Sequence, residues 1–123
     1  MRTKYFTYFE FIRSDVADKY SIKNYPSVDN EFYNIGKLSV ILDQLRHYIG
    51  CPLFINSGYR CPELNKAVGG ANNSNHLKGL AADITTHLRS IDVKLYEYIK
   101  ANKSYYNINE VILYDTFIHV SIY

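Results

Sequence analysis

The chain has 123 residues, of which 47% are hydrophobic and 21% charged, so it is long enough for one domain with a single core. Its net charge of +2 is too small to predict binding to nucleic acid, and no apolar run approaches the roughly 20 residues that a membrane span needs. The basic N-terminus is not followed by an apolar stretch or a cleavage site. We therefore expect a monomer made in the cytoplasm, with no secretory signal and no membrane insertion.

Helical spacing of apolar residues dominates about the first 50 residues. It predicts a helix over residues 6–20, interrupted at Ser14 and Asp15, where a further helical turn starts. A polar loop follows over residues 21–30. The clearest helix spans residues 31–49, with Asn30 as its N-cap and Gly50 directly after its end.

Shorter elements follow in the remaining part, about residues 51–123. In chain order they are a strand at 53–56, a helix at 62–68 that begins with Pro62, a loop at 71–77, a strand at 80–85, a helix at 91–102 capped by Ser90 with Asp92 in its first turn, and a hairpin of 110–114 and 117–123 that turns at Asp115 and Thr116. These elements predict one α+β domain over residues 1–123, with a small, largely antiparallel sheet and helices packed against it.

Three residues have the chemistry of a metal site. His76 lies in a polar loop, Asp83 in an apolar strand, and His119 in the last strand. Two imidazoles and one carboxylate are the ligand count of a catalytic zinc site that keeps one position open for water. A buried carboxylate such as Asp83 also needs a positive or hydrogen-bonding partner.

The motifs around these residues resemble a known family. They are Ser57-Gly58-Tyr59-Arg60, Leu64-Asn65, Val68-Gly69-Gly70, the pattern Ser-x-His-x-x-Gly-x-Ala-x-Asp from Ser74 to Asp83, and an apolar-x-His motif that ends at His119. In this order they resemble the M15 group of zinc D-Ala-D-Ala peptidases, which includes D,D-carboxypeptidases, dipeptidases and phage endolysins. The compact chain most resembles the small branch found in phages and bacteria.

The resemblance implies an M15/hedgehog-like zinc peptidase domain that cuts the stem peptides of bacterial peptidoglycan. It implies Zn²⁺ bound by His76, Asp83 and His119. It also implies that Arg60 binds a substrate carboxylate or the developing oxyanion, and that Ser74 contacts the substrate or orients its loop. Such an enzyme acts on the cell wall, which it reaches through a holin-permeabilised membrane or on a virion.

The general base is where the sequence departs from the family pattern. The family usually has an acidic residue three positions before the last histidine, and here that position is Thr116. We take Asp115 as the base and Glu110 as the reserve. If a strand continued through Asp115, its side chain would share a face with His119. If the chain turns at Asp115 and Thr116, that geometry is open.

Other interpretations of the same residues remain. The missing acid at Thr116 is compatible with an inactive, zinc-stabilised module that binds cell wall. A structural protein with a coincidental His/Asp set is a third possibility. His47 and His87 are expected to be surface histidines, and Cys51 and Cys61 reduced thiols. The chain has thirteen tyrosines and no tryptophan; tyrosines on a cleft rim could hold peptide or sugar, although we expect most to be half-buried.

Overall fold

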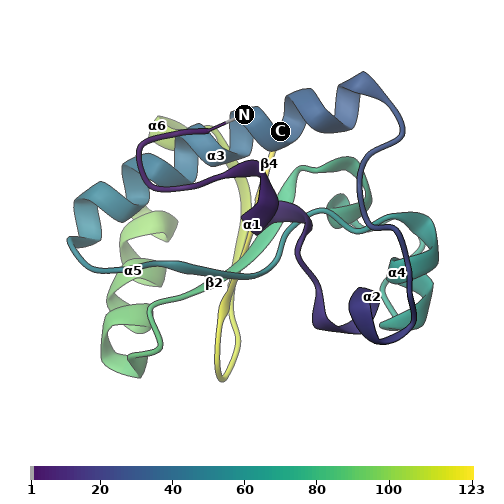
Figure 1. Ribbon diagram of the computed structural model, residues 1–123. Helices are drawn as coiled ribbons and strands as arrows, with labels where there is room; N and C mark the ends of the chain where they lie inside the picture. Colours follow the sequence, from purple (N-terminus) through teal and green to yellow (C-terminus); the bar gives the residue numbers. More distant parts are fainter. Residues whose placement is uncertain (1) are drawn as a thin grey trace.

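The computed structural model describes residues 2–123 and contains a four-stranded sheet with helices around it (Figure 1). The elements in chain order are α1 (Tyr8–Ile12), α2 (Asp15–Lys19), α3 (Asp29–Ile49), β1 (Phe54–Ser57), α4 (Pro62–Ala67), the 3₁₀ helix η1 (Asn75–Lys78), β2 (Ala81–Thr85), α5 (Arg89–Ala101), α6 (Lys103–Tyr106), β3 (Ile108–Leu113) and β4 (Ile118–Ile122). The predicted α+β class is confirmed.

The sheet has the strand order β1-β2-β4-β3, and every neighbouring pair is antiparallel. Side chains alternate between the two faces of a strand. One face of the central strands carries Ala82, Ile84, Ile118 and Val120, all fully buried in the core. The residues between them, including Asp83 and His119, therefore lie on the opposite face.

The long helix α3 supplies much of the core and runs across the molecule in Figure 1. It buries Ile35, Leu38, Leu42 and Leu45, at the spacing of three and four residues that the sequence predicts. The helix ends at Ile49, and Gly50 follows it directly as predicted, in the left-handed region with φ +75°. The buried core combines these residues with strand residues from the second part of the chain. None of the helices in residues 2–123 is both long and apolar enough to cross a bilayer.

The predicted interruption at Ser14 and Asp15 divides the helical region 6–20 into two short helices, α1 and α2, and α2 starts at Asp15 as expected. Arg13 between them is extended, and the Ser14 side chain accepts a hydrogen bond from the amide of Ala17 as the N-cap of α2. The chain breaks here because tertiary contacts take up the last carbonyls of α1. The amide of Tyr59 donates to Phe11 O, and Asn24 Nδ2 donates to Ile12 O.

Several helix boundaries also differ from the prediction. Helix α3 begins at Asp29, so Asn30 lies inside its first turn. Helix α5 begins at Arg89, before Ser90, because the buried Asp92 carboxylate reaches back and accepts from the Thr86 amide at 2.7 Å. The last three residues of the predicted loop at 71–77 belong to η1, and α6 is an additional turn of helix that periodicity does not reveal.

Candidate metal centre

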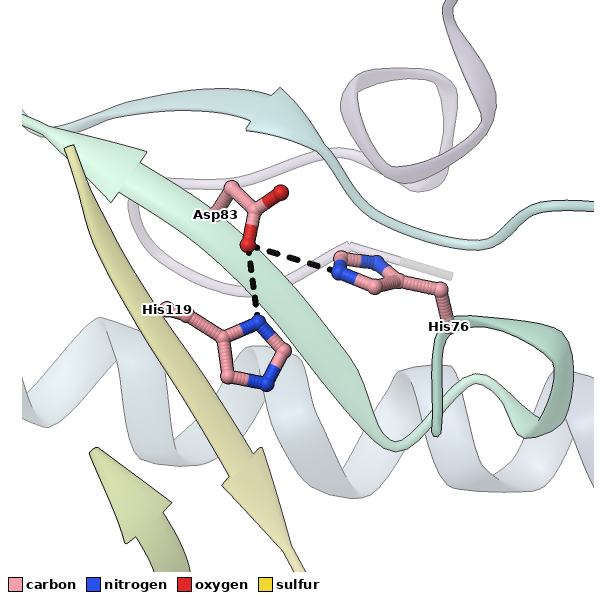
Figure 2. A group of neighbouring side chains, drawn as sticks. All are labelled: His76, Asp83 and His119. Carbon is pink, nitrogen blue, oxygen red and sulfur yellow. Dashed lines mark hydrogen bonds and ion pairs between the residues drawn. The ribbon is translucent and has the colours of Figure 1, made fainter. Parts of the chain in front are cut away.

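Three side chains from separate elements converge on one point of the sheet. His76 comes from η1, Asp83 from β2 and His119 from β4 (Figure 2). Asp83 Oδ1 lies 3.3 Å from His76 Nε2 and 2.9 Å from His119 Nδ1. One potential ligand atom from each residue lies within 4.8 Å of the other two. The predicted set of three residues is therefore brought together.

Strand pairing places two of these residues. Asp83 and His119 are direct Cα partners in the antiparallel pair of β2 and β4. Directly opposed residues of antiparallel strands point to the same face, with their Cβ atoms about 5 Å apart. The register of this pair is fixed by the buried apolar residues on the other face, because a slip of one residue would expose them.

The third residue, His76, is positioned by its own short helix. Ser74 caps η1, and its hydroxyl accepts from the amide of His76 at 3.2 Å. Gly79 ends η1 in the left-handed region with φ +74°, and a Cβ there would lie 2.7 Å from the carbonyl oxygen of Glu31. Only glycine meets both demands without strain. Backbone geometry thus explains why position 79 of the motif is a glycine.

A hydrogen bond to Gly58 selects the ligand nitrogen of His76. The side chain is only 3% exposed, and its Nδ1 lies 2.7 Å from Gly58 O, so Nδ1 carries the proton and donates. The other ring nitrogen, Nε2, faces Asp83 Oδ1 at 3.3 Å. This is the outer hydrogen bond that typically orients a metal-binding histidine. The sequence analysis did not assign this role to Gly58. The sequence shows only that a glycine lies between the predicted strand and Arg60, which does not reveal a hydrogen bond to His76.

His119 presents its two nitrogens to two different carboxylates. Nδ1 faces Asp83 Oδ1 at 2.9 Å, and Nε2 lies 3.7 Å from Glu110 Oε1. Glu110 lies on the edge strand β3, opposite Ser121, one diagonal step from His119 on the same face. The structure therefore puts the carboxylate of Glu110, the reserve choice for the base, beside the three converging residues.

Asp115 occupies a different place. The chain turns between Tyr114 and Phe117, whose backbone groups are hydrogen-bonded, and Asp115 is exposed in this turn. At about 3.4 Å per residue, the turn lies roughly 10 Å along the strand from His119. The shared strand face on which Asp115 was chosen as the base is not formed. The backbone carbonyl of Asp115 instead accepts a hydrogen bond from Arg89.

Arg60 and Ser74 lie next to His76. The amide of Arg60 donates to His76 O at 3.0 Å, and its Nη2 lies 3.5 Å from Ser74 Oγ. Burial lowers the pKa of the Arg60 guanidinium, and the charge of Asp83 opposes that shift. Within residues 2–123, Arg60 Nε is buried without a hydrogen-bond partner. The guanidinium thus keeps a free donor beside the centre, which suits it to bind an anionic group.

The electrostatics of the centre favour an ionised Asp83. Burial opposes ionisation, but hydrogen bonds from His119 and His76 outweigh it and lower the pKa of Asp83 to about 2. The centre therefore contains an ionised carboxylate between two imidazoles at neutral pH. Donor atoms bound to a tetrahedral zinc ion lie roughly 3.3–3.5 Å apart, close to the separations of 2.9 and 3.3 Å seen here. The donor set and its spacing fit zinc.

The remaining histidines lie outside this centre. His47 and His87 are exposed, as expected for surface residues. His47 Nδ1 lies 3.4 Å from the hydroxyl of Tyr5, and the ring of His87 packs against Phe54. Cys51 and Cys61 are free thiols, both half-buried.

Comparison with known proteins identifies one matching family. The family model for peptidase M15 matches residues 4–121, which is nearly the whole chain. No curated protein matches the chain. The match includes η1, β2 and β4, which carry His76, Asp83 and His119.

Proposed function

This chain belongs to the M15 peptidase family, and we propose that it is a zinc peptidase that hydrolyses peptide bonds in the stem peptides of bacterial peptidoglycan. M15 peptidases are zinc-dependent, and the group of His76, Asp83 and His119 could hold the metal. The observation that carries the proposal is the convergence of these three residues. Their convergence places an ionised carboxylate between two imidazoles, which is a donor set suited to zinc.

Each residue of the centre has a role in this proposal. His76 Nε2, Asp83 Oδ1 and His119 Nδ1 would hold the zinc ion, which supplies a Lewis acid and activates water for attack on the peptide carbonyl. Glu110, rather than Asp115, would accept the proton of the attacking water and later donate it to the leaving amine. Its carboxylate lies beside His119 and is half-exposed, so it can turn toward a bound substrate.

Arg60 supplies the positive charge that an anionic substrate needs. Its guanidinium is half-buried next to Ser74 and holds an unpaired donor. A planar guanidinium binds a carboxylate through two parallel hydrogen bonds. We therefore assign to Arg60 the binding of a stem-peptide carboxylate or of the developing oxyanion, with Ser74 holding it in place.

The decisive test measures metal and activity together. Purified protein should contain one zinc ion per chain and release free amines from purified sacculi, and a chelator should stop the release until zinc is restored. The variant His119→Ala should lose both zinc and activity. The exposed His87→Ala is the matched control and should keep both, because His87 lies outside the centre.

Three other outcomes would overturn parts of this proposal. A His119→Ala variant that stays active without metal would refute the zinc site. Full zinc occupancy without hydrolysis of any peptidoglycan would instead support an inactive module that binds cell wall. If the protein does not bind zinc in a stoichiometric amount, the arrangement of the two histidines and the aspartate is coincidental.

Product analysis would define the finer reaction. A D,D-carboxypeptidase releases free D-alanine, whereas an endopeptidase of the endolysin type releases larger fragments with new amino groups. In either case we propose that the site of action is the cell wall, reached on host lysis by a phage or from a virion. Lysis of cells from outside by added protein, compared with purified sacculi, would test access to the substrate.

A further inference from the structure

A cavity of about 450 Å³ lies between the N-terminal segment, the second half of α3 and α6. Four tyrosines line it, and we refer to it as the tyrosine cavity: Tyr5, Tyr48, Tyr105 and Tyr106. In Figure 1 the N-terminal segment and α6 both lie beside α3. None of the residues of the candidate metal centre lines this cavity. Its volume falls within the range of roughly 300–1,000 Å³ that is typical of ligand pockets.

Tertiary contacts hold one wall of the tyrosine cavity in place. Asp43 Oδ1 on α3 accepts hydrogen bonds from Thr3 Oγ1 and from the amide of Tyr5, both at 2.8 Å. The guanidinium of Arg46 lies 4.4 Å from the centre of the Tyr5 ring. These contacts join residues about 40 positions apart, so the N-terminal segment is fixed against α3. The cavity is therefore formed before any ligand arrives.

Two of the lining tyrosines, Tyr48 and Tyr105, present their rings to solvent. Tyr48 stacks on Tyr98, with ring centres 3.5 Å apart and planes 10° from parallel, and Tyr105 packs edge-on against Tyr106. The hydroxyls of Tyr98 and Tyr106 are hydrogen-bonded to each other. Even so, Tyr105 is 80% exposed and Tyr48 is 49% exposed. Two rings are thus held by neighbours while much of their surface stays open, which is the arrangement of a stacking platform.

Polar groups surround these rings. Gln44 and Lys4 line the cavity together with His47, and they offer amide, ammonium and imidazole groups. Asp43 and Lys4 both line the cavity, so its wall includes one acidic and one basic side chain. A pyranose sugar matches this combination, because its C–H face is apolar and stacks on an aromatic ring while its hydroxyls point outward to polar groups.

We propose that the tyrosine cavity binds neutral pyranose units of the glycan strand that carries the stem peptides. The proposal rests on the proposed function, since that substrate is a peptide attached to a glycan. Helix α6 leads into the edge strand β3, which carries Glu110. Tyr106 is the last residue of α6, and Glu110 follows four residues later in the chain, on β3. Binding the glycan here would raise the local concentration of its peptides at the metal centre.

The test uses a peptide-free sugar so that binding and hydrolysis are read separately. The probe is the β-1,4-linked tetramer of N-acetylglucosamine, titrated into the full chain and followed by amide chemical shifts in NMR spectra. We expect saturable shifts at Tyr48, Tyr105 and Gln44. Tyr105→Ala should weaken binding about 5- to 10-fold, and Tyr105→Phe should retain it, because the ring face rather than the hydroxyl makes the stacking contact. Tyr105 is so exposed that neither variant should disturb folding.

Two controls separate this proposal from the peptidase proposal. Tyr33→Ala removes a tyrosine that is 67% exposed elsewhere on α3, so it should leave sugar binding unchanged. His119→Ala should also retain sugar binding while it loses zinc and hydrolysis. No saturable binding of the tetramer, or equal binding by Tyr105→Ala, would overturn the glycan site even if hydrolysis is intact. Shifts at the tyrosine cavity caused by a free stem peptide but not by the sugar would identify a peptide site instead.

Discussion

Replacing Glu110 with glutamine is expected to slow hydrolysis without removing the metal. Glu110 Oε1 lies 3.7 Å from His119 Nε2, whereas Asp115 lies in the hairpin turn roughly 10 Å farther along the strand. Glutamine keeps the size of the side chain but cannot accept a proton. A positioned general base contributes about 100- to 10,000-fold to the rate, which corresponds to about 3–5 kcal/mol in the activation barrier.

Stability should change little in this variant. The side chain of Glu110 is 55% exposed, and substitutions at such surface positions usually alter the free energy of unfolding by less than about 0.5 kcal/mol. Glu110 is also outside the set of three proposed ligands. Zinc content and the melting temperature of Glu110→Gln should therefore equal those of the parent, and the loss should be confined to kcat.

The assay compares initial rates of amine release from sacculi for Glu110→Gln, Asp115→Asn and the parent chain, at equal zinc content. Asp115→Asn serves as the matched control, since it removes one acidic group of the same hairpin and should retain most of the activity. The reasoning is refuted if Glu110→Gln stays within about threefold of the parent rate. A larger loss of rate in Asp115→Asn than in Glu110→Gln would show instead that Asp115, in the turn, is the base.

The other predictions concern the backbone, the pH dependence and the substrate. Gly79→Ala should lower the free energy of unfolding by about 1–3 kcal/mol in urea titrations, because alanine is strained at φ +74° and its Cβ would meet the Glu31 carbonyl; an unchanged midpoint would contradict this. In metal-free protein, the folded pKa of Asp83 (about 2) lies below its ordinary value of 3.8, so its stabilisation is complete above about pH 4 and is lost as the pH falls toward 2. Between pH 4 and 2, the free energy of unfolding of the parent should thus fall by about 2 kcal/mol more than that of Asp83→Asn, measured by urea titration. Equal decreases would refute the hydrogen-bonded carboxylate. Arg60→Lys should lower kcat/KM about 10- to 100-fold by removing a bidentate contact, with zinc content unchanged; full activity would exclude substrate binding by Arg60.

Local sequence patterns were enough to predict much of the framework. The spacing of apolar residues predicted the core-facing side of α3, and Pro62 and Gly50 marked the start of α4 and the end of α3. These features depend on neighbours within one or two helical turns, so a linear pattern contains them. The same holds for the hairpin turn at Asp115 and Thr116.

The break between α1 and α2 was predicted from Ser14 and Asp15, but the tertiary contacts that accompany it were not. The spacing of apolar residues continues across Arg13, yet the helix stops there. The cause is the capture of α1 carbonyls by Tyr59 and Asn24, which are 12 to 48 residues away. Competition from such distant donors has no periodic signature in the sequence.

The sequence by itself indicated which residues could form the candidate centre, because the ordered motif singles out His76, Asp83 and His119. Only the tertiary structure decided how they are used. The Gly58 carbonyl selects the free nitrogen of His76, and the register of β3 against β4 brings Glu110, rather than Asp115, beside His119. The physical reason is that residue type fixes which atoms can bind or transfer a proton, while hydrogen-bond partners and distances arise from pairings between strands and loops that lie far apart in the chain.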